Sequence, residues 1–139
     1  MMHLLIPVDG SDDAGRAAAF AATLARKLNA SISLLFVYDV PTASAMGLAR
    51  QSPEDIERIK ADVASGSFGP ARATLDELPT TEHVQIGHPA QEIDGFARSG
   101  GADLVVMGSR GLSALEGLLL GSVSDHVLGH AHCPVMIVR

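Results

Sequence analysis

The stretch from Met107 to Ser124, MGSRGLSALEGLLLGSVS, has the residue types and spacing of a phosphate-binding loop. Three of its glycines divide it: Gly108, Gly111 and Gly121. Glycine has no Cβ, so it can adopt a positive φ and let backbone N–H groups approach a ligand closely. An apolar segment precedes the loop and a helical pattern follows it, and the start of such a helix offers unpaired N–H groups to an anion. The stretch therefore predicts phosphate binding, although the same glycines could serve only to turn the chain.

The donors to a phosphate would come from the loop and from the start of the helix. Gly121 lies at their junction, where we expect a positive φ and an open backbone. The N–H groups that follow it belong to Ser122, Val123 and Ser124, and the two serines add hydroxyls. Arg110 lies inside the loop, and its planar guanidinium suits phosphate oxygens. A Walker loop and a dinucleotide fingerprint are excluded, because no lysine follows a glycine and no GxGxxG follows the first strand.

The apolar pattern of the whole chain places this loop at the edge of a parallel sheet. Five segments are predicted strands, at residues 3–8, 31–38, 82–86, 103–107 and 134–138. Helical patterns separate them, with starts at or just after Ser11, Ser52, Pro89 and Ser122. We expect the second helix to break at residues 65–70 and to resume over 71–78. The alternation predicts an α/β fold with helices on both faces of the sheet, in one domain spanning residues 1–139.

Ligands of such sheets bind beyond the carboxyl ends of the strands, where the winding direction reverses. The segments that reach this edge are Asp9-Gly10 after the first strand, 37–39 after the second and 108–122 after the fourth. We expect them to converge on one crevice. A long aperiodic segment from Asp39 to Gln51 starts at the same edge and is predicted to be a mobile lid.

Several motifs make the chain similar to the universal stress protein family. The spacing Gly108, two residues, Gly111, nine residues, Gly121-Ser122 is the nucleotide-binding signature of that family. Further matches are IPVDGS at 6–11, LLFV at 34–37, GHPA at 87–90 and CPV at 133–135. The resemblance covers nearly the whole chain and implies a single doubly wound domain with a five-stranded parallel sheet in the strand order 3-2-1-4-5.

The resemblance also implies a ligand, namely ATP, AMP or another adenine nucleotide, bound with Mg²⁺. The aspartate that matches Asp9 lies beside the nucleotide, where it would meet the ribose, the adenine or the metal ion, although Asp9 could also serve only to make a turn. The backbone of Val37 would lie against adenine, and Phe36 stands where many relatives have histidine. The predicted binding residues are Pro7, Val8, Asp9, Val37, Met107, Gly108, Arg110, Gly111, Gly121, Ser122, Val123 and Ser124.

Composition limits the partners. The chain has 139 residues, a net charge of −6 and only 4% aromatic residues, which disfavours binding to DNA, to anionic membranes and to stacked single-stranded bases. Because aromatic residues are scarce, the core must be packed mainly from Ala, Val, Leu and Ile. The single cysteine excludes an intrachain disulfide, and no apolar run reaches membrane-spanning length. We expect a cytoplasmic protein with no nucleic-acid partner and no membrane insertion.

Other chemistry is less well supported by the sequence. His126 and His130 stand four residues apart on a predicted helix, but they would supply only two of the usual three or four metal ligands. Cys133 is interpreted as a small buried residue rather than a nucleophile. Asp9 and Ser124 are the candidates nearest a terminal phosphate, yet nothing identifies either as catalytic, so no catalytic residue is predicted.

The predicted function is that of an ATP-binding universal stress protein, which acts as a nucleotide-responsive regulatory or stress-response factor. The alternatives are a slow ATPase or phosphate-transfer enzyme, and a structural dimeric stress factor with a degenerate site. The last predicted strand, 134–138, is apolar and would form an exposed sheet edge. We therefore expect a homodimer through this strand, as the resemblance also implies, with a higher oligomer open and a regulatory partner protein unspecified.

Overall fold

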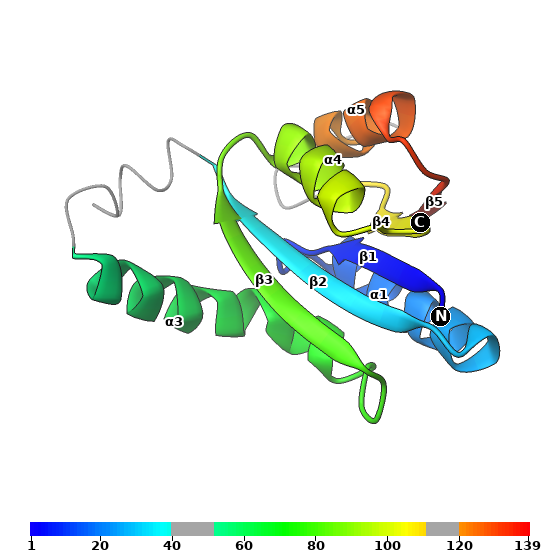
Figure 1. Cartoon of the computed structure of the whole chain (residues 1–139), viewed down its shortest axis with the longest axis horizontal. Coiled ribbons are helices and arrows are strands. Elements are labelled where there is room, and N and C mark those ends of the chain that lie inside the picture. The colour runs from blue at the N-terminus through cyan, green and yellow to red at the C-terminus, as the bar shows by residue number, and fades with distance from the viewer. Residues whose placement is uncertain (40–51, 111–119) are drawn as a thin grey trace.

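The computed structural model describes residues 1–39, 52–110 and 120–139 of the chain. Strands and helices alternate along these residues (Figure 1). They are β1 (His3–Pro7), α1 (Asp12–Leu28), β2 (Ser31–Tyr38), α3 (Pro53–Arg72), β3 (Thr80–Ile86), α4 (Pro89–Ser99), β4 (Leu104–Gly108), α5 (Ser122–His130) and β5 (Val135–Val138). The expected alternation of strand and helix is confirmed, with ends that differ by one or two residues.

The strands form one parallel five-stranded sheet in the order β3-β2-β1-β4-β5. The chain runs outward from β1 through β2 to β3, then returns to the other side of β1 for β4 and β5. Figure 1 shows α1 and α3 on one face of the sheet and α4 and α5 on the other. This doubly wound arrangement confirms the predicted fold class and strand order, and its winding reverses between β1 and β4.

A tight turn leads from β1 into α1. Gly10 has φ of +84°, a conformation that favours glycine. The backbone N–H of Ser11 donates to Asp9 Oδ1 at 2.9 Å, and Ser11 Oγ in turn accepts from the N–H of Ala14 at 3.2 Å. Ser11 is therefore the N-cap of α1, as the sequence predicts.

α3 is one continuous helix, so the predicted break at residues 65–70 and the predicted helical piece at 71–78 are wrong. Pro70 lacks a backbone N–H and leaves the carbonyl of Gly66 without its helical partner. Both residues are exposed, so water can reach that carbonyl. Phe68 and Ala71 are 2% and 1% exposed, and their burial holds this part of the helix against the core. Packing thus overrides local propensity at Pro70.

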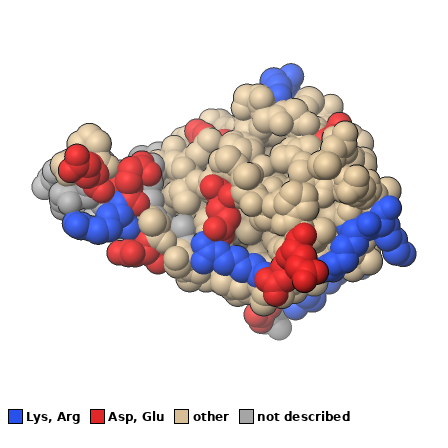
Figure 2. All heavy atoms as spheres, turned by 60° about the horizontal axis from the view of Figure 1, so that its bottom comes forward, with Lys and Arg blue, Asp and Glu red and all other residues tan. Residues whose placement is uncertain are grey.

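The edge strand β3 carries charge. Arg72 of α3 donates from Nε and Nη2 to the two carboxylate oxygens of Glu82 in β3, at 2.6 and 2.7 Å. Charged side chains on an edge strand hinder its pairing with another chain. On the face drawn in Figure 2, Lys and Arg lie among Asp and Glu and do not gather into one basic patch. Among the residues described, no helix combines the length and apolar character needed to cross a bilayer.

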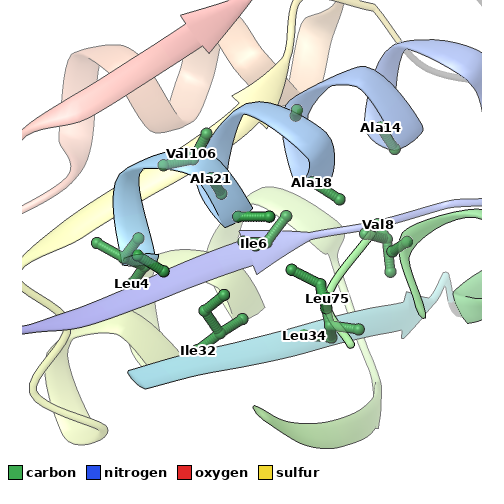
Figure 3. Close-up of a cluster of buried hydrophobic side chains, with 14 of the residues drawn as sticks. Leu4, Ile6, Val8, Ala14, Ala18, Ala21, Ile32, Leu34, Leu75 and Val106 are labelled. Carbon is green, nitrogen blue, oxygen red and sulfur yellow. The ribbon is translucent and has the colours of Figure 1, made fainter. Parts of the chain in front are cut away.

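Small side chains on α1 let this helix lie close to the sheet. Ala17, Ala18 and Ala21 are fully buried, in a cluster that includes Ile6 and Val106 (Figure 3). Leu28, the last residue of α1, is 47% exposed and lies outside this cluster. A second cluster lies on the other face, under α4 and α5, and includes Leu5, Leu35, Ile93, Ala97, Met107 and Val127. Small aliphatic residues therefore dominate the core, as the scarcity of aromatic residues predicts.

We expect Ala18→Leu to lower the free energy of unfolding by about 1–3 kcal/mol, because the larger side chain has no space between α1 and the sheet. Ala19 is the next residue of the same helix and is exposed, so Ala19→Leu is the matched control. The control should change stability by no more than about 0.5 kcal/mol. Urea denaturation measures both, and equal midpoints for the two variants would contradict close packing at Ala18.

Candidate functional site

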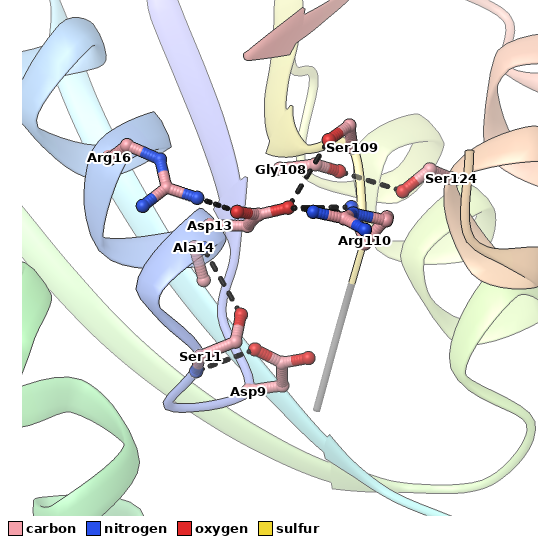
Figure 4. Close-up of polar contacts among 9 residues, drawn as sticks. All are labelled: Asp9, Ser11, Asp13, Ala14, Arg16, Gly108, Ser109, Arg110 and Ser124. Carbon is pink, nitrogen blue, oxygen red and sulfur yellow. Dashed lines mark hydrogen bonds and ion pairs between the residues drawn. The ribbon is translucent and has the colours of Figure 1, made fainter. Parts of the chain in front are cut away.

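The ends of β1 and β4 lie beside each other where the winding of the sheet reverses. Asp9 follows β1, and Ser109 and Arg110 follow β4. The N-terminus of α1 begins just after the Asp9 turn, and the N-terminus of α5 is held to the end of β4 by hydrogen bonds. Figure 4 shows these groups together. The structure thereby joins residues from the first and fourth strands at one edge of the sheet.

Asp13, in the first turn of α1, connects this helix to the residues that follow β4. Its side chain is 10% exposed. Oδ2 accepts from Ser109 Oγ at 3.2 Å and from the backbone N–H of Arg110 at 3.1 Å. Oδ1 pairs with the guanidinium of Arg16, and Arg110 Nε lies 3.9 Å from Oδ2. The buried charge of Asp13 is therefore offset by two arginines and hydrogen-bonded by a hydroxyl and a backbone amide.

Two hydrogen bonds fix the start of α5 against the end of β4. The backbone N–H of Gly121 donates to the Ser109 carbonyl at 2.6 Å, and Ser124 Oγ donates to the Gly108 carbonyl at 2.7 Å. Ser124 is 4% exposed. In this structure its hydroxyl proton is directed at the protein backbone, whereas the sequence suggested a phosphate as the acceptor. The first-turn N–H groups of α5 have no acceptor within the helix itself.

Gly108 and Gly121 serve different structural purposes. A Cβ on Gly108 would lie 2.8 Å from the backbone carbon and from the Cβ of Asp13, so glycine permits the close approach of α1 to β4. Gly121 has φ of −71° and ψ of 162°, and the expected positive φ is therefore wrong. Any residue adopts this extended backbone. The absence of a side chain at Gly121 matters instead because no side chain then caps α5.

The residues expected to surround adenosine lie on β1 and β2. Pro7 ends β1 opposite Leu35 in β2. The N–H of Val8 donates to the Leu35 carbonyl at 2.9 Å, and the side chain of Val8 is buried under α1 and α3. Val37 is partly buried near the end of β2. These positions can offer backbone groups to a ligand, together with the carboxylate of Asp9.

The other predicted residues are spread over the end of β4 and the start of α5. Met107 is 4% exposed and packs in the core under α4 and α5, so its side chain points away from the strand end. Ser122 is exposed, and Val123 is partly buried against the same core. Gly111 lies outside the described residues, as does the predicted lid beyond Asp39.

The two histidines considered as metal ligands contact each other and α4. The rings of His126 and His130 stack with centroids 4.0 Å apart, and His126 Nε2 lies 3.6 Å from Asp94 Oδ2. Within the described parts of the chain, no group of three His, Cys, Asp or Glu residues could hold a metal ion. Cys133 is only partly buried, whereas a buried residue was expected, but this burial still raises the pKa of its thiol and disfavours the nucleophilic thiolate at neutral pH. These residues are explained by packing between α4, α5 and β5.

Asp13 and Ser109 are not among the binding residues that the sequence predicts. In the sequence, Asp13 is one of two acidic residues in the first turn of a helix, a position that the helix dipole alone would explain. It stands four residues before Ala17, however, and therefore on the buried face of α1. A carboxylate on a buried face requires partners. The sequence therefore indicates that Asp13 needs partners, but it does not indicate which residues they are.

A model of the universal stress protein family matches residues 1–139 of the chain. The chain belongs to the universal stress protein family. It is 36% identical over 139 residues to universal stress protein MJ0531 of Methanocaldococcus jannaschii, with 98% of this chain and 81% of that protein covered. The resemblance suggested by the glycine spacing is thereby confirmed.

Solved structures share the fold. The hypothetical protein MJ0577 superposes with a TM-score of 0.82 at 24% identity, over 99% of this chain and 94% of that chain. A universal stress protein of Archaeoglobus fulgidus, solved in complex with dAMP, superposes with a TM-score of 0.68 at 25% identity, over 100% of this chain and 98% of its own. Both cover the doubly wound sheet that positions the residues of Figure 4.

We expect Gly108→Ala to destabilise the protein by about 1–3 kcal/mol, because the added methyl group would overlap the backbone of Asp13. Gly95 in α4 is the control, since a Cβ there meets no atom within 4 Å. Gly95→Ala should stabilise the protein by about 0.5–1 kcal/mol through helix propensity. Thermal unfolding of both variants tests this, and a Gly108→Ala protein as stable as the wild type would show that α1 and β4 can separate without cost.

Proposed function

We propose that the protein binds an adenine nucleotide between the ends of β1 and β4 and acts as a nucleotide-responsive regulatory or stress-response factor. The start of α5 carries this proposal. Gly121 leaves that helix without a side-chain cap, and hydrogen bonds to Ser109 and Gly108 hold it at the strand edge. Its first-turn N–H groups and its dipole suit a phosphate. The complex of the Archaeoglobus fulgidus relative with dAMP supports an adenine nucleotide as the ligand.

The proposed roles divide between the two sides of the crevice. The phosphates would bind at the glycine loop and at the first turn of α5, at Gly108, Arg110, Gly111, Gly121, Ser122, Val123 and Ser124. Adenosine would lie against the backbone of Pro7, Val8, Val37 and Met107, with Asp9 near the ribose. Mg²⁺ bound to the phosphates would offset their charge, with Asp9 as the carboxylate at the end of β1. ATP is the proposed nucleotide, and AMP would use the same adenosine contacts.

The described side chains favour binding over hydrolysis. A hydrolytic site needs a group that accepts a proton from water, or positions that water, near the terminal phosphate. Ser124 Oγ donates to the Gly108 carbonyl, and Asp9 Oδ1 accepts from the N–H of Ser11. Both groups are engaged in holding the backbone of the site. Occupancy by nucleotide, rather than turnover, would then set the state of the protein.

Gly121→Val is expected to weaken ATP binding by at least about a hundredfold, because a branched side chain at the N-cap would keep the phosphate from two charge-assisted hydrogen bonds. The fold should persist, since φ of −71° is open to valine. Gly129→Ala, in the same helix with no atom within 4 Å of the added Cβ, is the control and should bind ATP as the wild type does. Titration calorimetry with ATP and magnesium measures this. A folded Gly121→Val protein with near-normal affinity would refute the phosphate site.

The proposed homodimer would form through β5. In the described sheet β5 and β3 are the two edge strands, and only β3 carries a charged residue. Val135, Met136, Ile137 and Val138 give the edge of β5 no charge that would oppose pairing with a second copy. A two-fold axis at this edge would extend one sheet into the next and remove the exposed edge.

Exposed apolar side chains flank β5 on both faces of the sheet. Phe20 of α1 is 45% exposed. On the same helix Gly15 faces Pro70 of α3, and Arg26 donates to the Thr74 carbonyl in the turn after α3. Phe20 lies roughly 120–140° around the helix from both of them. Leu128 of α5 is 49% exposed and lies roughly 160° from His126, which faces α4. Both helices also contact β5. Phe20 and Leu128 therefore lie toward the free edge of the sheet, where a second copy would cover them.

We expect Leu128→Asp to convert a dimer to a monomer at micromolar concentration, because two buried carboxylates would face each other across the axis. Ile86→Asp is the control, since Ile86 is 37% exposed at the end of the opposite edge strand. Sedimentation velocity distinguishes the two states. A wild type that is monomeric, or a Leu128→Asp protein that remains dimeric, would argue against this interface.

A further inference from the structure

Asp13 stands beside Arg110, yet the proposed nucleotide contacts do not include it. Its Oδ2 accepts from Arg110 N at 3.1 Å and lies 3.9 Å from Arg110 Nε. The side chain of Asp13 is 10% exposed and that of Arg110 is 43% exposed. The carboxylate therefore meets the inner part of the arginine, and solvent meets the rest (Figure 4).

The position of the carboxylate is itself well determined. Ser109 Oγ donates to Oδ2 at 3.2 Å, and Arg16 pairs with Oδ1. The missing Cβ of Gly108 lets the backbone of Asp13 approach the end of β4. Asp13 is thus part of α1 and is hydrogen-bonded to the residues after β4, so its carboxylate has a fixed position beside the more exposed Arg110.

The two arginines offset the charge of Asp13. One carboxylate, Asp13, faces two guanidinium groups, Arg16 and Arg110, so these three side chains carry a net charge of +1, which Asp9 at the end of β1 brings to zero for the charged side chains of Figure 4. A buried carboxylate without this compensation would repel a phosphate, whereas here the surplus charge lies on the exposed arginines. An arginine whose backbone N–H is hydrogen-bonded to a carboxylate, and whose Nε lies in an ion pair with it, also loses less freedom when it binds a second anion.

We propose that Asp13 is a positioning residue for polyphosphate recognition, which holds Arg110 so that its exposed donors meet the phosphates of the nucleotide. This inference rests on the proposed function, because it assumes that the nucleotide binds beside β4. Asp13 would therefore strengthen the binding of ATP but not that of adenosine, since adenosine has no phosphate for Arg110 to bind. The residue acts through Arg110 and does not itself contact the ligand.

The test measures binding of ATP with magnesium, and of adenosine, to the wild type, Asp13→Asn, Arg110→Gln and the double variant. We expect Asp13→Asn to weaken ATP binding by about tenfold and to leave adenosine binding within about twofold. Arg110→Gln should show the same selective loss. The double variant should bind ATP no more weakly than Arg110→Gln alone, because the two side chains act as one unit.

Asp12→Asn is the matched control, since Asp12 is the exposed neighbour in the same helical turn and carries the same charge. It should bind both ligands as the wild type does. Equal losses of ATP and adenosine binding in Asp13→Asn would mean that Asp13 only supports the fold, and additive losses in the double variant would mean that it acts independently of Arg110. Either result overturns the inference.

The experiment separates this inference from the function on which it rests. A wild type that binds neither ligand overturns both, whereas a wild type that binds ATP while Asp13→Asn binds it equally well overturns only the role of Asp13. If Asp13→Asn does not fold, Arg110→Lys tests the same contact, because lysine keeps the charge but lacks Nε. A loss of ATP binding of about tenfold supports the positioning role, and full ATP affinity in Arg110→Lys overturns it.

Discussion

The contact between Asp13 and the residues after β4 is the interaction on which the site depends. It joins the first turn of α1 to Ser109 and Arg110 across 96 and 97 residues of sequence. A buried carboxylate is costly unless donors surround it, so the chain supplies a hydroxyl, an amide and two guanidinium groups. Because these donors come from both helix and strand end, the carboxylate fixes the position of α1 relative to the end of β4.

Close packing makes that contact possible. Alanines on the buried face of α1 bring the helix near the sheet, and Gly108 removes the one side chain that would keep the first turn away. The same residues that build the core therefore determine where the site residues lie. Core packing and the candidate site are coupled at this point, since a larger residue at Gly108 would displace Asp13 and with it the backbone that leads to Arg110.

The two edge strands of the sheet, β3 and β5, differ in charge. Edge strand β3 is covered by the ion pair of Glu82 with Arg72, while edge strand β5 is apolar and is flanked by Phe20 and Leu128. A doubly wound sheet has two free edges, and in this sheet one edge strand carries a charged residue while the other is apolar. Charge on β3 opposes pairing with another chain, whereas β5 carries no charge that would oppose it.

The sequence alone determined the order of strands and helices and the family, because apolar periodicity and glycine spacing are local properties of the chain. Ser11 was predicted as an N-cap for the same reason. Only the tertiary structure decided that α3 continues through Pro70, that Gly121 needs no positive φ, and that Ser124 donates to Gly108. It alone identified Ser109, Arg16 and Arg110 as the partners of Asp13. These outcomes depend on burial and on groups that are distant in sequence, and no local pattern specifies which side chains meet when the sheet closes.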